Sequence, residues 1–451
     1  MKSNIQYSFY FRRAIIGITM ILLSCNNENT TLIQPHQLAW EWADMTLFIT
    51  KNTPANSPTF ASRALGYIGL TMYETVVHKD STYQSLSGQL NALENLPLPE
   101  KNKEYYWPLA LNSGQAAILK HIYLQTSEEN KQKIDSLERV LKKKLAREVS
   151  NKAVIDRSVA FGKDIAEAIF EWSKNDGGHR GYLNNFDKSY TPKVFPGSWQ
   201  PPLFAQSFSH HPLHPYWGNN RTFSLANQEL DLPEIIPYST DKNSAYYKEF
   251  YEVYEAEKAL TDAQKQTAIW WSDDPDVTFS PGGHLYYIAG ILVKYYQPDL
   301  MHSAKTYAQV GMAVADAFIL CWRWKYHFFS ERPNTFIPKN IDIQWESFWP
   351  DPPFPSFPSG HAIQAGAAAT ALMDLYENNT VFIDSAHAGR ERDHVRDTDF
   401  VPRKYNSIWE VADETAQSRF LGGIHTKQDN LVGLEQGKII ADNINKMQWR
   451  E

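Results

Sequence analysis

The sequence predicts an all-α protein. Apolar residues recur with a period of about 3.6 over most of the chain, and proline-rich connections separate the periodic segments. The alternation of apolar and polar residues that would indicate an extensive sheet is not found. With 451 residues, 43% of them hydrophobic and 14% aromatic, the chain can bury a large core. We therefore expect one large helical domain or two closely packed ones.

Periodicity and capping residues place the helices along the chain. The expected helices span residues 36–51, 60–79, 103–125, 128–146, 150–175, 242–258, 261–272, 283–294, 301–329, 360–376, 404–422 and 428–445.

The segment 189–241 is too rich in proline for a helix or a central strand. We expect this long loop to wrap the helical body and to form part of the mouth of a site. Its three histidines, His210, His211 and His214, have spacing that suggests a metal site. Because neither cysteine nor a carboxylate accompanies them, exposed loop histidines are the preferred interpretation.

The N-terminus is typical of an exported bacterial lipoprotein. Arg12 and Arg13 precede an apolar run that ends in Leu22-Leu23-Ser24-Cys25, which resembles a lipobox. A short amphipathic helix is the alternative. We predict a signal peptide over residues 1–24, lipid on Cys25 and a polar tether over residues 25–35. The protein would then be anchored in the periplasm or at the outer membrane or cell surface.

Composition limits the remaining possibilities. The net charge of -7 provides no basic field for nucleic acid. No further apolar run reaches the roughly 18 residues of a membrane helix, so membrane contact is expected only through the lipid. Residues 36–259 should form an N-terminal helical region, and residues 260–446 a second helical bundle that carries the motifs. Only Cys321 remains after lipidation, so we expect no intrachain disulfide.

The first motif joins Lys325 and Arg332. Lys325 continues the apolar face of the expected helix 301–329, which points its ammonium group inward. A lysine whose amine reaches solvent at the helix end is the alternative. Two adjacent buried cations need a bound anion to stay charged together, so we expect an anion here.

The second motif is Ser359-Gly360-His361, where a proline-rich loop gives way to an alanine-rich helix. A helix N-terminus presents unpaired N–H groups to an oxyanion, and Gly360 allows close approach. Ser359 as a simple N-cap is compatible with that role.

The third motif contains Arg419, His425 and Asp429. Asp429 follows His425 by one helical turn, so its carboxylate can accept from one ring nitrogen and leave the other as a nucleophile or ligand. Such a pair is otherwise often found on a surface, but its position after a double glycine and near Arg419 favours a functional role.

The three motifs, in this order and spacing, resemble the signature of the vanadium-dependent haloperoxidases and the type 2 phosphatidic acid phosphatase superfamily, including the bacterial branch with iodoperoxidases. The resemblance covers residues 325–429 and implies two four-helix-bundle-like halves with long Pro-rich loops. It implies vanadate, containing vanadium(V), as the cofactor. The residues expected to bind its oxygens are Lys325, Arg332, Ser359, Gly360 and Arg419.

The resemblance also implies the catalytic roles. His425 would bond to vanadium in a peroxidase or attack phosphorus in a phosphatase, with Asp429 as its partner. His361 would be the acid–base group, and Lys325 would polarise the bound peroxide.

Two aromatic residues favour the peroxidase. Phe354 matches the aromatic side chain that flanks vanadate in chloroperoxidase, and Trp322 matches a tryptophan of the same pocket. An apolar wall suits a poorly hydrated halide better than a phosphate ester. The long region before Lys325 also exceeds that of a compact acid phosphatase.

Two features lie outside the motifs. Asp273 resembles a chloroperoxidase aspartate that supports the acid–base histidine, so it could orient His361; Asp274 is the competing candidate. The stretch 362–417 is long for the family and leaves substrate access and oligomer contacts undefined.

The sequence therefore predicts a haloperoxidase that oxidises iodide, with bromide as the second choice, using hydrogen peroxide. A small organic molecule could accept the halogen, and the oligomeric state is undetermined. The alternatives are a periplasmic acid phosphatase with a phosphohistidine intermediate and a non-catalytic oxyanion-binding lipoprotein.

Overall fold

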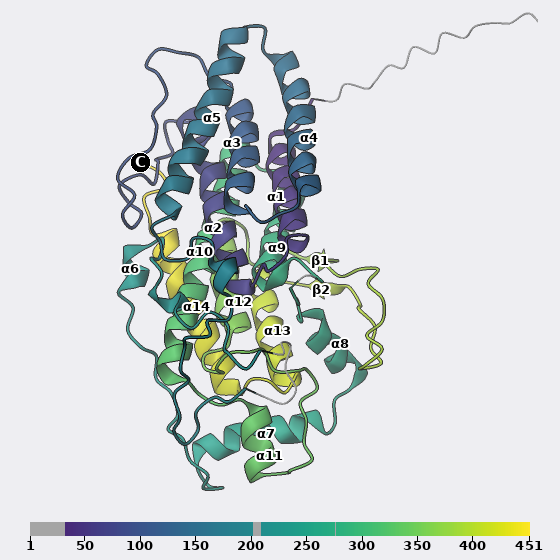
Figure 1. Ribbon diagram of the computed structural model, residues 1–451. Helices are drawn as coiled ribbons and strands as arrows, with labels where there is room; N and C mark the ends of the chain where they lie inside the picture. The colour runs from purple at the N-terminus through teal and green to yellow at the C-terminus, as the bar shows by residue number, and fades with distance from the viewer. Residues whose placement is uncertain (1–31, 202–208, 276) are drawn as a thin grey trace, which may run out of the picture. The chain divides into compact units, whose positions relative to one another are not determined.

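The computed structural model describes residues 32–201, 209–275 and 277–451. In these residues the chain forms fourteen α-helices and one two-stranded sheet (Figure 1), which confirms the all-α prediction. Residues 33–451 form one compact unit. The expected signal peptide, Cys25 and most of the tether lie outside the described residues, and the division near residue 260 stays a prediction.

The helices follow the expected order. Their bounds are α1 Pro35–Lys51, α2 Pro58–Glu74, α3 Trp107–Ile122, α4 Glu128–Leu145, α5 Lys152–Ser173, α6 Leu225–Gln228, α7 Ala245–Glu257, α8 Asp262–Trp270, α9 Ser280–Tyr296, α10 Leu300–Phe328, α11 Pro333–Asn340, α12 Gly360–Met373, α13 Ile408–Leu421 and α14 Lys427–Asn445. Short 3₁₀ turns lie at Val77–Lys79, Ala146–Glu148, Gly181–Asn184 and Trp217–Asn219.

Helix α10 is central to the core. The Asp299 carboxylate caps its start by accepting from the His302 N–H at 2.8 Å, and Phe329 in the left-handed region ends it. Nearly all of its side chains are buried, and it packs against α2, α12 and α14. In Figure 1, α3, α4 and α5 lie at one end of this unit and α12, α13 and α14 lie in the other half. The C-terminal end of α10 carries Lys325.

Helices α12 and α14 approach closely because glycines face the partner backbone. A Cβ added at Gly437 would lie 2.1 Å from the Ile363 carbonyl oxygen, and one at Gly366 would lie 2.6 Å from that of Leu434. The contact brings the two helix N-termini together, and the Ser359 N–H donates to the Asp429 carbonyl oxygen at 2.9 Å. A backbone hydrogen bond therefore joins the second and third sequence motifs.

The expected helix 404–422 begins late. Arg403–Tyr405 is strand β2, which pairs antiparallel with β1, Phe382–Asp384. Helix α13 starts only after Ser407, whose side chain accepts from the Glu410 N–H. The prediction was wrong at this end because Tyr405 packs on Phe382 across the strands, a pairing that local periodicity does not record. Helix α11 was not expected.

The proline-rich loop lies against α10 in its described parts. The Leu213 N–H donates to the Pro353 carbonyl oxygen at 2.8 Å, and the Leu213 carbonyl accepts from the Trp322 indole at 3.1 Å. Within this loop, the Phe223 and Ser224 N–H groups donate to the buried Asp316 carboxylate and so hold the start of the short helix α6, which the sequence did not predict.

The loop histidines have different surroundings. His210 is exposed, as predicted, but His214 is buried, where its Nδ1 bonds Thr59 and its ring stacks on Trp217. The exposed assignment was wrong for His214 because it packs at the start of α2. Within the described residues, no potential metal cluster includes these histidines.

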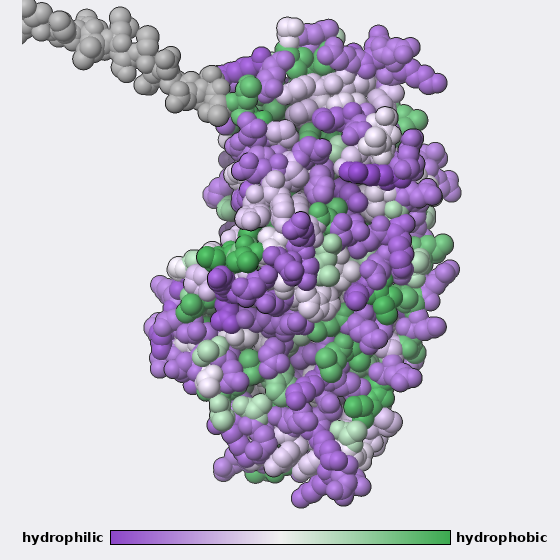
Figure 2. All heavy atoms as spheres, turned by 180° about the vertical axis from the view of Figure 1, so that it is seen from behind, coloured by the Kyte–Doolittle hydropathy of each residue, from purple (hydrophilic) through white to green (hydrophobic). Residues whose placement is uncertain are grey.

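Hydrophilic residues cover most of the face seen in Figure 2, with hydrophobic ones in separate groups. Among the described residues, no helix combines the length and apolar character that a bilayer span requires.

Candidate active site

Lys325 is fully buried and points inward, as predicted. Its ammonium group donates to the carbonyl oxygens of Pro355 and Ser356, at 2.8 and 2.5 Å. Burial lowers the pKa of Lys325 to about 7, because the two carbonyls replace only part of its hydration. A nearby anion would restore its positive charge.

Arg332 connects the site's segments. Its guanidinium donates to the carbonyl oxygens of Phe354 at 2.9 Å and Ile424 at 2.8 Å, and one of its nitrogens lies 3.3 Å from His425 Nε2. Within the described ranges, neither Arg332 nor Lys325 has a carboxylate within the 4.0 Å of an ion pair. These buried cations are therefore held by carbonyl dipoles and lack an adjacent negative partner.

Arg419 is the third buried cation. It donates to the Ser418 hydroxyl at 3.0 Å and to the Ala268 carbonyl oxygen at 2.9 Å. Burial lowers its pKa to about 10, so it stays charged at neutral pH. The contact with Ala268 couples α13 to the end of α8.

The N-terminus of α12 faces these cations. The Ser359 hydroxyl accepts from the Ala362 N–H at 3.4 Å and so keeps its own hydrogen for a ligand. A Cβ added at Gly360 would meet nothing closer than Trp322 at 3.8 Å, with the Lys325 side chain at 3.9 Å. Protein packing therefore does not require glycine here. The open space between Gly360 and Lys325 suits an oxyanion on the helix N-terminus.

His425 has one nitrogen fixed and one available. Its Nδ1 lies 2.8 Å from the Asp429 carboxylate, which also accepts from the Ser356 hydroxyl at 2.5 Å. The hydrogen therefore belongs on Nδ1, and Nε2 carries the lone pair. Burial, followed by the charges of Arg332 and Lys325, lowers the pKa of His425 well below its ordinary value. Its Nε2 accepts only a long hydrogen bond from Arg332, at 3.3 Å, so this neutral imidazole can act as a nucleophile or a metal ligand.

His361 leaves its Nε2 without a partner in the described structure, although that atom is buried. The Trp271 backbone hydrogen-bonds the ring, which assigns Nδ1 as the donor. Burial lowers the pKa of His361 well below its ordinary value, Arg419 lowers it further, and the charge of Asp273 opposes both. An unpartnered buried nitrogen beside cations is suited to accept a proton from a bound molecule.

The second and third motifs meet at one cavity of about 700 Å³, lined by Gly360, His361, Arg419 and His425. Trp322 and Phe354 form part of its wall, with their ring centroids 4.9 Å apart. Lys325 and Arg332 lie over the Phe354 ring, at 5.3 and 5.2 Å. Leu213 of the proline-rich loop also lines the cavity, as predicted for that loop.

This arrangement of buried cations, helix N-terminus and neutral imidazole suits a tetrahedral oxyanion. Residues 305–450 match the family model of the VCPO (vanadium chloroperoxidase) second helical-bundle domain. In its fold, this chain is similar to the vanadium haloperoxidases. No curated protein matches the chain.

The solved haloperoxidases share its fold over most of their length. A bacterial vanadium-dependent iodoperoxidase superposes with a TM-score of 0.78 at 29% identity, covering 93% of this chain and 98% of that one. An apo-type bacterial vanadium-dependent chloroperoxidase gives a TM-score of 0.66 at 14% identity, covering 87% and 93% of the two chains. A holo-type one gives 0.64 at 16% identity, covering 93% of each. The two chloroperoxidases show the fold alone.

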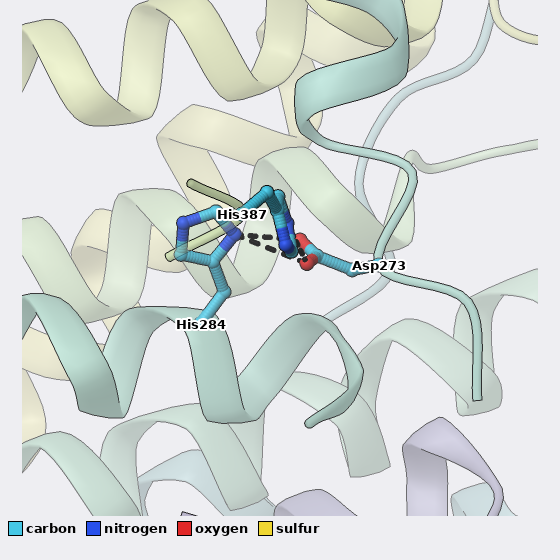
Figure 3. Close-up of side chains that lie close together, drawn as sticks. All are labelled: Asp273, His284 and His387. Atoms are coloured by element: carbon cyan, nitrogen blue, oxygen red, sulfur yellow. Dashed lines mark hydrogen bonds and ion pairs between the residues drawn. The ribbon is translucent and has the colours of Figure 1, made fainter. Parts of the chain in front are cut away.

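In this haloperoxidase fold Asp273 is near His361 but bonded elsewhere. Its carboxylate pairs with His284 Nδ1 at 2.9 Å and His387 Nε2 at 3.0 Å (Figure 3). The structure gives no direct hydrogen bond between Asp273 and His361; the charge of Asp273 instead raises the pKa of His361, so a supporting role of Asp273 stays a prediction. The competing Asp274 is near Arg419, although burial raises its pKa to about 6.

The sequence interpretation missed several residues that support the candidate site. Ser356 lies in the proline-rich stretch just before Ser359, so its proximity to His425 could have been suspected. His284, Asp384 and His387 gave no local signal, since they come from α9, β1 and the loop after β1.

Proposed function

We propose that the protein is a vanadate-dependent haloperoxidase that oxidises iodide with hydrogen peroxide. Bromide is the second choice of halide. The observation that carries the proposal is the cavity lined by Arg419, a neutral His425 and a His361 whose Nε2 has no partner, with the buried cations Arg332 and Lys325 close enough to lower the pKa of His425.

The residues fit a bound vanadate. Lys325, Arg332 and Arg419 would neutralise its oxygens, and the Ser359 hydroxyl with the first N–H groups of α12 would donate to them. The open position at Gly360 leaves room for such a group. His425 Nε2 would be the ligand of vanadium, and Asp429 holds the proton of that ring on Nδ1. When bound, vanadate supplies Lewis-acid activation of hydrogen peroxide.

Side chains of the protein would transfer the protons, stabilise the developing charge and contact the halide. His361 Nε2 would accept a proton from the incoming peroxide and return it to the product, while the Trp271 backbone fixes its other nitrogen. A protonated Lys325 would stabilise the charge that develops on oxygen. Trp322 and Phe354 offer a poorly hydrated halide an apolar wall.

Iodide is favoured because it is the halide that is most easily oxidised. The similarity to a bacterial iodoperoxidase at 29% identity supports the same choice. Hypohalous acid, or its equivalent, would leave the site and halogenate an organic acceptor.

A phosphohistidine phosphatase would use the same groups, with His425 as the nucleophile and His361 as the acid. One experiment separates the two functions. Purified protein is incubated with orthovanadate and assayed for triiodide formation with hydrogen peroxide and iodide, and then for p-nitrophenyl phosphate hydrolysis without vanadate. We expect vanadate-dependent triiodide and no hydrolysis. Hydrolysis without triiodide would replace the haloperoxidase by the phosphatase.

His425→Ala is the matched control. It should abolish triiodide formation and nearly all tight vanadate binding, since it removes the ligand to vanadium. Turnover like that of the wild type would overturn the assignment.

We also propose export and lipidation at Cys25, outside the described residues. Metabolic labelling with an alkyne fatty acid should mark the wild type and leave Cys25→Ser unlabelled. Labelling of the variant would place the lipid elsewhere.

A further inference from the structure

Four buried side chains form a chain of hydrogen bonds behind His361. Asp384 accepts from His284 Nε2 at 2.8 Å, His284 Nδ1 donates to Asp273 at 2.9 Å, and His387 Nε2 donates to the other Asp273 oxygen at 3.0 Å. Figure 3 shows dashed lines from both imidazoles to the Asp273 carboxylate. Two of the members, Asp384 and His387, come from the 374–407 segment, the non-helical part of the chain between α12 and α13.

The hydrogen bonds define the protonation of this network. His284 faces a carboxylate at each ring nitrogen, so both nitrogens carry hydrogen. Burial opposes the charge, but Asp273 and Asp384 raise the pKa of His284 to about 10. Burial raises the pKa of Asp273, but His284 and His387 outweigh this effect and hold the pKa well below its ordinary value. The network therefore contains an imidazolium and two carboxylates.

Asp273, His284 and His387 are close enough together to suggest a metal site. The protonated His284 has no lone pair to offer a metal ion, and hydrogen bonds already explain the short distances. The geometry favours a network of hydrogen bonds over a metal centre.

The network clamps the segment 270–273. The Trp270 indole donates to Asp384 at 2.7 Å, and the Trp271 ring stacks on His284 with centroids 4.3 Å apart. Asp273 itself has a φ of 47°, in the left-handed region, which costs free energy unless the surroundings hold it. The contacts that hold the segment 270–273 in place are therefore made with residues outside it.

That segment is also what His361 contacts. The Trp271 backbone hydrogen-bonds the His361 ring. The charge of Asp273 raises the pKa of His361, whereas Arg419 and His425 lower it. A loosened segment would release the ring nitrogen that now bonds backbone and would move the negative charge. His361 could then take the other tautomer or turn its Nε2 out of the cavity.

We propose that the 374–407 segment is a positioning element for the acid–base histidine: Asp384 and His387 hold Trp271 and Asp273 so that His361 presents Nε2 to the cavity. The inference rests on the proposed role of His361 in halide oxidation. It gives a function to a stretch of chain that the sequence left unassigned.

The test compares Asp384→Asn, His387→Leu and His387→Gln with Ile383→Thr. Ile383 lies beside Asp384 on β1 but is exposed, so it controls for changes in the strand. Gln retains a donor for Asp273, whereas Leu does not. Melting temperatures identify the folded variants, and the His387 pair leaves the Asp384 and His284 contact intact if Asp384→Asn does not fold.

The first readout needs no activity. Long-range ¹H–¹⁵N correlation spectra of histidine-labelled apo-protein report the tautomer of each imidazole, and His361→Gln identifies the His361 signals. We expect a single His361 tautomer protonated on Nδ1 in the wild type, Ile383→Thr and His387→Gln. In His387→Leu and Asp384→Asn we expect mixed tautomers. An unchanged His361 in both folded variants would overturn the proposal.

The second readout is the pH profile of iodide oxidation. His387→Leu and Asp384→Asn should lower kcat about tenfold or more and shift the profile, with the vanadate requirement within twofold of the wild type. A vanadate requirement that rises instead, with kcat unchanged, would assign the segment to anion binding and overturn the proposal. If the spectra change as expected but no form of the protein oxidises iodide, the positioning role stands and the proposed function fails.

Metal ions provide the last control. We expect the His284 and His387 signals to be the same after EDTA and after added Zn²⁺. A shift of both on adding Zn²⁺ would make the network a metal site and overturn the proposal.

Discussion

Single side chains in this site owe their chemical state to burial as much as to neighbours. Burial lowers the pKa of Lys325, Arg332 and Arg419. None of the three side chains is exposed to water that could offset the free-energy cost of burying its charge. His425 stays neutral for the same reason. Such a cluster is unstable alone and is stabilised by an anion, which is the property that a vanadate or phosphate site needs.

Gly360→Ala should separate folding from anion binding. Its added methyl group meets no protein atom closer than 3.8 Å, so the melting temperature should stay the same or rise slightly. The methyl group would occupy space expected for the anion, and an overpacking cost of about 1–3 kcal/mol would weaken vanadate binding roughly 5- to 150-fold. Calorimetric titration with vanadate and thermal melting check the two parts. Unweakened binding would place the anion elsewhere.

Lys325 should make oxyanion binding depend on pH. In the free site its pKa is about 7, and a bound anion raises that pKa, so binding above pH 7 requires uptake of a proton. The affinity should therefore fall as the pH rises from 7, by up to about tenfold per unit. Sulfate is the probe because it stays fully ionised over this range.

Titrations with sulfate at pH 6, 7, 8 and 9 provide the measurement. Lys325→Met should bind sulfate more weakly and with little pH dependence over the same range. A wild-type affinity that is constant or rises with pH would contradict the assignment.

At the scale of elements, the contact between α12 and α14 sets the geometry of the anion site. Glycines let the two backbones pack closely. This contact aligns the N-terminus of α12 with His425 and Asp429 at the start of α14. The proline-rich loop before α12 supplies carbonyls that hold Lys325 and Arg332. The elements therefore act as a rigid frame for the cations.

Gly437→Ala should disturb that frame. Its Cβ would lie 2.1 Å from the Ile363 carbonyl oxygen, so α14 must move away from α12, at a cost of about 1–3 kcal/mol or more. Thermal melting should show the loss, and vanadate affinity should fall because Asp429 moves with α14. Gly290→Ala is the control, since its Cβ comes no closer than 3.4 Å to the Tyr307 hydroxyl. Equal melting of the two variants would contradict the close-packing argument.

For the molecule as a whole, buried charges connect stability to pH. The folded pKa of His284, about 10, lies above the ordinary value of 6.5. Its stabilising contribution is therefore fully present below pH 6.5 and is lost as the pH rises through 10. The size is on the order of a few kcal/mol.

The difference in melting temperature between the wild type and Asp384→Asn isolates this contribution. Asp384→Asn removes one of the two charges that hold His284 protonated, so the wild type's advantage should be largest near pH 6.5 and should shrink toward pH 10. Melting curves at half-unit intervals measure it. An advantage that grows with pH would mean that His284 is neutral in the folded protein.

Local sequence predicted most of the helices and most of the site. Helices α4, α7, α8, α10 and α14 lie within a few residues of their expected bounds, because periodicity and capping are properties of neighbouring residues. The inward direction of Lys325 and the pairing of His425 with Asp429 were predicted for the same reason, since both follow from spacing along one helix.

Other features depend on residues far apart in the chain. The start of α13 was misplaced because β2 pairs with a strand about twenty residues earlier, and short strands carry little local signal. His214 was expected on the surface, but it packs on α2.

The sequence by itself determined which groups could hold an oxyanion: the cations, the helix N-terminus and the His–Asp pair, all readable from residue type and local spacing. Only the tertiary structure decided the partners of Asp273, the place of Ser356 beside His425 and the joining of α9 with the 374–407 segment behind His361. Such contacts arise from the packing of whole helices, and burial then fixes protonation states that no stretch of sequence specifies.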